Sequence, residues 1–198
     1  MNIDEHYICK DQNRFIVNNI SKQIQDGQYK IIEELVHICA CPNMQCVEIG
    51  SWTGNSAVLI GTIVKRVLGK LYSIDWYLGG KAEEHLKETA EIIDVRKVFL
   101  DNINFFNLND TVEQLPITSE EACKNFENDY LDFIFIDGDH SYEMVKKDIN
   151  YWLPKLKKGK IIAGHDYYND DYTGVKKAVD ESFSNAKHLK EIWWIKKI

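Results

Sequence analysis

Paired cysteines are missing from this sequence of 198 residues. Its five cysteines are an odd number without a C-x-x-C pair, and Cys39 and Cys41 are only two positions apart. This spacing fits neither a disulfide framework nor a zinc site. We therefore expect reduced thiols, as in the cytoplasm.

Long apolar runs, excess positive charge and proline-rich linkers are also missing. No apolar run approaches the roughly 18 residues of a membrane span, and the stretch from Met1 to His6 carries no apolar signal-peptide region. The 24 Lys and Arg residues against 31 Asp and Glu residues give a net charge of -7. Nucleic acids and anionic membranes attract basic proteins instead. We expect a cytoplasmic protein that binds neither nucleic acid nor membrane.

Helix and strand patterns alternate along the chain from about residue 28. Apolar runs bounded by turn residues predict strands, and apolar residues spaced by three and four predict helices between them. The run 131–137 is apolar nearly throughout, which is typical of a strand buried on both faces. Strands separated by helices indicate an α/β fold, with a doubly wound, mostly parallel sheet and helices on both faces. The predicted strands are 45–49, 70–75, 111–117, 131–137, 160–164 and 191–195.

The first 28 residues form an N-terminal segment that precedes one α/β domain over 29–198. Ile16, Ile20 and Ile24 recur at every fourth position, which predicts an amphipathic helix. Such a helix could dock on the sheet, cover the active site as a cap or pair with a second subunit in a homodimer. The three roles stay open at this point.

A glycine-punctuated loop over 48–56 joins the first predicted strand to the next helix. Glycine lets the backbone take a positive φ and approach a ligand. The loop departs from the dinucleotide motif G-x-G-x-x-G, because Trp52 stands where the second glycine meets the pyrophosphate. It suits a cofactor without pyrophosphate whose amino-acid end lies against the loop, and a structural turn without ligand is the alternative. The candidate cofactor-binding residues here are Glu48, Gly50, Ser51, Gly54, Asn55 and Ser56.

An acidic residue, Asp75, follows the second predicted strand about 20 residues past this loop. A carboxylate at that place can accept both ribose hydroxyls of an adenosine. Trp76 comes next and could cover the adenine face. The alternative is that Asp75 caps the following segment and Trp76 belongs to the core.

Four segments together resemble the class I S-adenosylmethionine-dependent methyltransferases, and within them a small bacterial O-methyltransferase-like group. The stretch Trp152–Gly159 also fits, although Lys160 stands where the group has a second glycine. The resemblance covers residues from about 30 to 198 and implies a seven-stranded, Rossmann-like sheet. The four segments are Val47–Ser56, Ser73–Trp76, Phe135–Tyr142 and Ile161–Tyr167.

The resemblance also implies roles for single residues. The loop from Gly50 to Gly54 would hold the methionine part of S-adenosylmethionine, and Asp75 would bind its ribose. Ser119, after the third predicted strand, would lie near the adenine. Asp137 would lie beneath the sulfonium end of the cofactor.

Acidic and histidine side chains follow two neighbouring predicted strands, in Asp137-Gly138-Asp139-His140 and in His165-Asp166. Carboxyl ends of parallel strands share one edge of a sheet, so these side chains can converge. In one interpretation Asp137, His165 and Asp166 bind a divalent ion, Mg²⁺ or a softer metal, which lowers the pKa of a substrate hydroxyl. Metal-dependent O-methyltransferases look similar here but carry an acidic-plus-amide pair at 165–166.

Two other interpretations of these residues stay open. His140 or His165 can act directly as a general base on the acceptor. Alternatively, Asp139 caps the next helix and His165 only hydrogen-bonds within its loop. The candidate catalytic residues are Asp137, Asp139, His140 and His165.

The sequence thus predicts an S-adenosylmethionine-dependent methyltransferase that acts on a hydroxyl of a small molecule, a sugar or a secondary metabolite. The acceptor would be deprotonated by a divalent metal or by a His/Asp base. A nicotinamide-dependent oxidoreductase on a related sheet is an alternative, against which Trp52 argues. A non-catalytic protein that binds S-adenosylmethionine is the other.

Overall fold

The computed structural model describes residues 27–80 and 84–198. The N-terminal helix predicted from Ile16, Ile20 and Ile24 lies outside the described residues, so its role stays a prediction. Within the described ranges, every helix is too short or too polar to cross a lipid bilayer.

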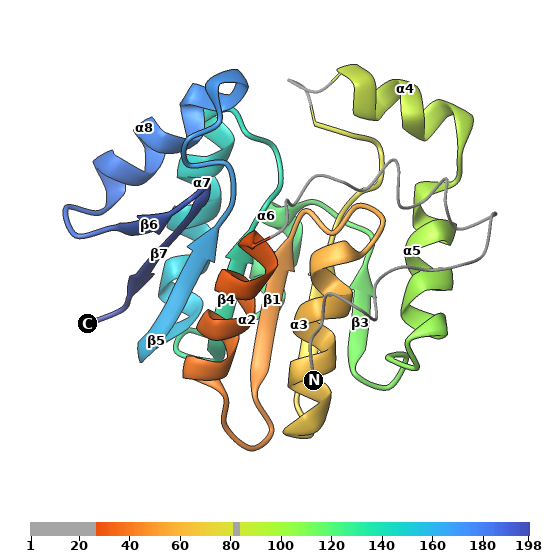
Figure 1. Cartoon of the computed structure of the whole chain (residues 1–198), viewed down its shortest axis with the longest axis horizontal. Coiled ribbons are helices and arrows are strands. Elements are labelled where there is room, and N and C mark those ends of the chain that lie inside the picture. Colours follow the sequence, from red (N-terminus) through yellow and green to blue (C-terminus); the bar gives the residue numbers. More distant parts are fainter. Residues whose placement is uncertain (1–26, 81–83) are drawn as a thin grey trace.

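A seven-stranded sheet with the order β3-β2-β1-β4-β5-β7-β6 forms the centre of the molecule (Figure 1). β1 to β5 run parallel to one another, whereas β7 is antiparallel to both of its neighbours. The prediction of a mostly parallel sheet is therefore confirmed. The strands are β1 (Gln45–Ile49), β2 (Lys70–Ile74), β3 (Val112–Leu115), β4 (Leu131–Ile136), β5 (Leu156–Gly164), β6 (Lys187–Leu189) and β7 (Ile192–Lys196).

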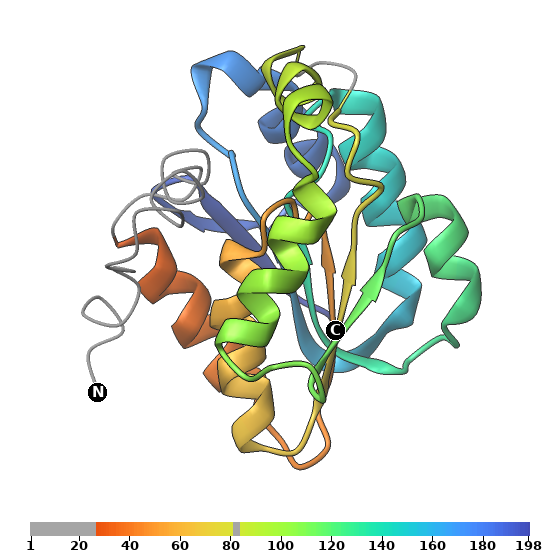
Figure 2. The ribbon, with the colours of Figure 1, turned by 90° about the vertical axis from the view of Figure 1, so that its right-hand side faces the viewer.

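Helices cover both faces of this sheet (Figure 2). One face carries α2 (Gln28–Cys39), α3 (Asn55–Arg66) and α5 (Val95–Phe105). The other face carries α6 (Ser119–Ala122), α7 (Tyr142–Trp152) and α8 (Thr173–Ser182). The remaining helix α4 (Glu84–Ile92) lies at the top of Figure 1, near the carboxyl ends of the strands. Three short 3-10 helices are η2 (Cys123–Asn125), η3 (Leu153–Lys155) and η4 (Asp170–Tyr172).

Strand β4 is the buried centre of the sheet. Its side chains alternate between two cores: Phe133 and Phe135 pack on the side of α2 and α3, and Ile134 and Ile136 pack on the side of α7. Every residue of β4 is buried, as the apolar run predicted. Its one charged residue, Asp132, is compensated by the ammonium group of Lys157 at 3.0 Å, because a buried charge needs a partner.

The hydrogen-bond ladder of the sheet continues one residue beyond four strand ends. The backbone N–H of Gly50 donates to Ile74 O (2.9 Å), and that of Asp137 donates to Ile49 O (2.7 Å). In the same way, Asp75 N donates to the carbonyl of the last residue of β3 (3.2 Å), and His165 N donates to that of β4 (3.1 Å). These bonds hold four of the predicted site residues in one row along the carboxyl edge of the sheet.

Three features of the fold differ from the expectations. β5 begins at Leu156 rather than at 160, and Gly159 lies inside it with a φ of +77°. Helix α5 was not expected, although Val95, Phe99 and Ile103 have helical spacing and are its buried residues. β6 was also missed, because its three residues are all exposed and carry no apolar pattern.

A capping box begins α6. Thr118 Oγ1 accepts a hydrogen bond from Glu121 N (3.3 Å), while Thr118 N donates to the Glu121 carboxylate (3.2 Å). We expect Thr118→Ala to lower the free energy of unfolding by about 1 kcal/mol, the usual cost of losing such a cap. Urea unfolding would measure it. Thr118→Ser keeps the hydroxyl and is expected to stay near the wild type; equal losses in both variants would contradict the role of the cap.

Candidate functional site

A cavity of about 540 Å³ opens at the carboxyl edge of the sheet. Its walls come from the segments that follow β1 to β5, together with residues of α4, α6, α7 and η4. In doubly wound sheets this is where ligands bind, at the point where the strand order reverses, here between β1 and β4. The volume is typical of a site for a small molecule or cofactor.

The predicted site residues divide into those that line this cavity and those that do not. Five predicted cofactor residues do not line it: Glu48, Ser51, Gly54, Asn55 and Ser56. The residues that do line it are Gly50, Asp75, Trp76, Ser119, Asp137, Asp139, His140, His165 and Asp166.

The two loop glycines are required by the packing of the protein itself. Gly50 and Gly54 have φ angles of +85° and +92°, which favour glycine. A Cβ at Gly50 would lie 1.9 Å from the carbonyl oxygen of Asp137, and one at Gly54 would lie 3.0 Å from the ring of Phe99. The sequence interpretation, which assigned the glycines to close approach of a ligand, therefore missed this internal reason.

Glu48 is completely buried in β1 beneath the loop. Ser73 Oγ, its neighbour in β2, donates a hydrogen bond to the carboxylate at 3.2 Å. Burial raises the pKa of Glu48 to about 7, against the opposing effect of the nearby Ser56 and Ser51 hydroxyls. Glu48 itself does not line the cavity.

Backbone N–H groups fix the carboxylate of Asp75. Trp52 N donates to Oδ2 (2.7 Å), and Tyr77 N donates to Oδ1 (2.6 Å). Trp52 and Tyr77 both have positive φ angles, +42° and +60°. A carboxylate can accept about four hydrogen bonds.

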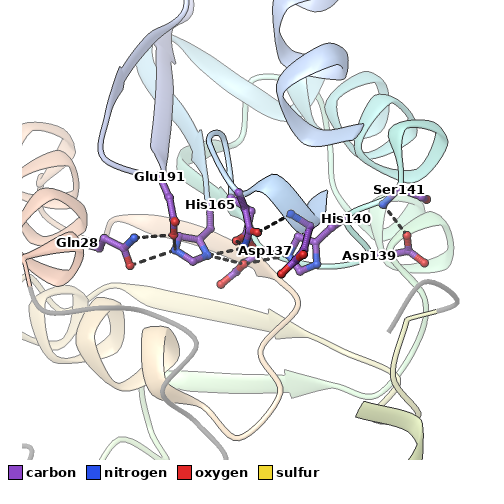
Figure 3. Close-up of polar contacts among 10 residues, drawn as sticks. Gln28, Asp137, Asp139, His140, Ser141, His165 and Glu191 are labelled. Carbon is purple, nitrogen blue, oxygen red and sulfur yellow. Dashed lines mark hydrogen bonds and ion pairs between the residues drawn. The ribbon is translucent and has the colours of Figure 1, made fainter. Parts of the chain in front are cut away.

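Two aspartates and two histidines meet at the ends of β4 and β5 (Figure 3). His140 Nε2 donates to Asp166 Oδ2 at 2.8 Å and lies 3.5 Å from Asp137 Oδ1. His165 Nδ1 lies 3.0 Å from the same Asp166 oxygen and 3.4 Å from the same Asp137 oxygen. The side chains therefore converge as predicted, and each imidazole lies close to the same two carboxylate oxygens, Asp166 Oδ2 and Asp137 Oδ1.

Further polar residues hold His165 from the opposite side. Its Nε2 donates to Gln28 Oε1 (3.2 Å), and Gln28 Nε2 in turn donates to Glu191 Oε2 (2.8 Å). Asn169 Nδ2 donates to the second oxygen of Asp166 at 2.7 Å. The ring of Tyr172 stacks on His140 with centroids 4.3 Å apart. Gln28, Glu191, Asn169 and Tyr172 were not among the predicted site residues.

The charges of this cluster stabilise one another. Burial opposes the charged form of His165, but the carboxylates of Asp137 and Asp166 outweigh it and raise the pKa of His165 to about 10. Burial likewise opposes ionisation of Asp137 and Asp166, yet the two histidines hold the pKa of each carboxyl below its usual value. Both nitrogens of His165 face acceptors, which agrees with an imidazolium.

The donor set in the cluster fits a divalent metal ion. Asp137, His140 and Asp166 each offer one ligand atom, and these atoms lie within 4.8 Å of one another. A second group of this kind consists of His165, Asp166 and Glu191. Carboxylate oxygens suit hard ions such as Mg²⁺ and Mn²⁺, and the imidazole among them favours a transition metal such as Mn²⁺ over Mg²⁺. The first group has His140 where the sequence interpretation placed His165.

Several lining residues carry no motif and were missed. Asp148 and Met144 reach the cavity from α7, and His85 and Leu86 reach it from α4. Thr118, the N-cap of α6, lines the cavity too. Helical spacing alone could have pointed to Asp148, because it lies on the same side of α7 as buried Val145 and Ile149.

Comparison with known proteins gives consistent matches. A family model described as a methyltransferase domain matches residues 47–167. The uncharacterized protein R132 of Acanthamoeba polyphaga mimivirus is 23% identical over 167 residues, which are 84% of this chain and 71% of that protein.

Solved structures show the same fold. The O-methyltransferase from Bacillus cereus in complex with SAH has a TM-score of 0.68 and 19% identity, over 98% of this chain and 95% of that chain. Cofactor-bound Rv0187 from MTB has a TM-score of 0.69 and 12% identity, over 96% of this chain and 92% of that chain.

The raised pKa of Glu48 predicts a pH-dependent stability. A carboxyl whose pKa rises from 4.5 to about 7 on folding contributes stability below pH 4.5 that is lost as the pH rises to about 7. We expect the free energy of unfolding of the wild type to fall by about 3 kcal/mol more than that of Glu48→Gln between these pH values. Urea unfolding at several pH values measures it. The exposed Glu127→Gln is the control, and parallel curves for wild type and Glu48→Gln would contradict the prediction.

Proposed function

We propose that this chain, which belongs to the methyltransferase-domain family matched over residues 47–167, methylates a hydroxyl group of a small molecule. It is a class I S-adenosylmethionine-dependent methyltransferase. The observation that carries the proposal is the common cavity. Gly50, Asp75 and Ser119 line it together with Asp137, His140 and Asp166. One bound pair of cofactor and acceptor could therefore contact both sets of residues.

The cofactor would extend along the row of strand ends. S-adenosylmethionine supplies a methyl group that is already electrophilic, so the protein has only to align the reactants and handle a proton. Asp75, held by two backbone N–H groups, would accept the ribose hydroxyls. Trp76, 45% exposed at the cavity wall, would cover part of the ligand. Asp137 would lie nearest the sulfonium, whose positive charge its carboxylate attracts.

The acceptor hydroxyl would bind at the Asp137–His140–Asp166 group. With His165 protonated, the three carboxylates of Asp137, Asp166 and Glu191 leave negative charge in excess beside the cavity. A divalent ion held by Asp137, Asp166 and an imidazole would balance this charge and lower the pKa of the hydroxyl. We favour this route for that reason.

The His140–Asp166 pair is the second candidate for taking the proton. Asp166 accepts from Nε2 of His140 at 2.8 Å, which orients the ring and would stabilise its charged form, as a carboxylate does for a catalytic histidine. Stacking on Tyr172 fixes the plane of the ring. His165 is less suited to this task, because both of its nitrogens already face acceptors.

Cofactor binding tests the proposal directly. We expect calorimetric titration to give micromolar binding of S-adenosylhomocysteine and none of NAD. Asp75→Asn should weaken S-adenosylhomocysteine binding by about tenfold or more, since a charge-assisted hydrogen bond contributes about 1.5–3 kcal/mol. Asp110→Asn, an exposed substitution of the same kind, is the control. If folded wild-type protein fails to bind S-adenosylhomocysteine, the proposed function is wrong.

Metal binding separates the two routes for the proton. We expect Mn²⁺ to bind the protein saturated with S-adenosylhomocysteine, and Asp166→Asn to weaken this binding by at least about tenfold, because it removes a charged ligand. Calorimetry with Mn²⁺ as the probe measures both. Asp110→Asn again serves as the matched control. Absence of Mn²⁺ binding to the saturated wild type would refute the metal route and leave the His140–Asp166 pair.

A further inference from the structure

Asp148 is a buried carboxyl at the cavity wall to which the proposed mechanism gives no task. It lies on α7, is 2% exposed and lines the cavity. Aspartate is rarely buried without a partner. Its position next to Ser119 places it on the α6 side of the cavity, away from His165 on β5.

A short hydrogen-bond chain fixes the orientation of this carboxyl. Trp152 Nε1 donates to Ser119 Oγ (2.8 Å), and Ser119 Oγ donates to Asp148 Oδ1 (2.5 Å). A serine hydroxyl has a single proton, so Ser119 cannot donate it to a ligand as well. A ligand near Ser119, which the resemblance places close to the adenine, would therefore not receive this proton, and the partner carboxyl of Asp148 is the charged acceptor on this wall.

The second oxygen of Asp148 lies beside Gly138, at the wall of the cavity. A Cβ built on Gly138, which also lines the cavity, would lie 3.9 Å from Asp148 Oδ2. Among residues 27–80 and 84–198, Ser119 is the hydrogen-bond partner of this carboxyl, and it uses Oδ1. Oδ2 is thus an acceptor available to a ligand group that binds between Gly138 and Ser119.

The neighbouring walls suit a flat, largely apolar ring. Ile74, Ile117 and Met144 line the cavity with Asp148. On the proposed function, the ribose lies at Asp75 and the reacting methyl near Asp137, so the base of the cofactor is the part left for this wall. An adenine has one hydrogen-bond donor on its edge, the 6-amino group, whereas a 6-oxo purine presents an acceptor there.

We propose that Asp148 selects the adenine of the cofactor by accepting a hydrogen bond from its 6-amino group at Oδ2, with Ser119 and Trp152 as positioning residues. This inference rests on the proposed function. A buried acceptor would reject a 6-oxo purine, because two acceptors would then face each other without a proton between them.

Two ligands that differ at this position, and in the proton that the 6-oxo purine carries on the adjoining N1, test the inference. Calorimetry at pH 8.5 compares S-adenosylhomocysteine with S-inosylhomocysteine, its 6-oxo analogue. This pH lies above the pKa of Asp148, which burial foremost, together with nearby Asp139, raises to about 7. We expect the wild type to prefer S-adenosylhomocysteine by about tenfold or more, the effect of one buried polar mismatch.

Asp148→Asn should abolish or invert this preference. The Ser119 hydroxyl would keep the amide oxygen on its side, which turns the amide NH₂ group toward the ligand. That donor suits the 6-oxo group and opposes the 6-amino group. Asp110→Asn, on the exposed surface, should leave the ratio of the two affinities as in the wild type.

The ratio is measured on one protein sample, so a loss of folded protein cannot imitate the expected change. An Asp148→Asn variant that keeps the wild-type preference would overturn the inference while leaving the proposed function intact. Binding of neither ligand to the folded wild type would overturn both.

Discussion

The site depends on one constraint, the continuation of the parallel hydrogen-bond ladder beyond the strand ends. Gly50, Asp75, Asp137 and His165 each donate their backbone N–H to the last carbonyl of the neighbouring strand. The sheet therefore sets the spacing of four functional positions before any ligand is present. If flexible loops alone carried these four positions, ordering them would cost conformational entropy. The rigid edge also explains Gly50, whose missing Cβ lets the β1 and β4 ends meet.

Features encoded over short distances could be predicted from the sequence. The buried run of β4, the capping box of Thr118 and the strand-to-helix loop each depend on residues within about ten positions of one another. The clustering of Asp137 and Asp166 could also be predicted from the sequence, because the carboxyl ends of parallel strands lie at the same edge of a sheet for any loop conformation.

Features that depend on distant segments could not be predicted. Gln28 and His165 are 137 positions apart in the sequence, yet their side chains are hydrogen-bonded. No spacing rule connects α2 with the end of β5. Side-chain direction was equally hidden: Glu48 precedes Gly50 by two residues but faces away from the cavity, toward Ser73 and the α3 side of the sheet. Sequence reasoning located the loop correctly and could not say which of its side chains point outward.

Neighbours rather than residue type decide what each carboxyl of the cavity can do. Asp137 and Asp166 lie against imidazoles that hold their pKa values low, so they remain anionic and suited to a cation or to an acceptor hydroxyl. Asp148 has no basic partner at hydrogen-bond distance among the described residues; burial raises its pKa to about 7, and it contacts a neutral hydroxyl. Environments that push the pKa values of similar groups apart separate their roles. The cavity thus has an ionic end at β4 and β5, where carboxylates and imidazoles meet, and an end at α6 with one carboxyl of raised pKa. In the proposed complex, the charged sulfonium would lie at the first end and the uncharged base at the second.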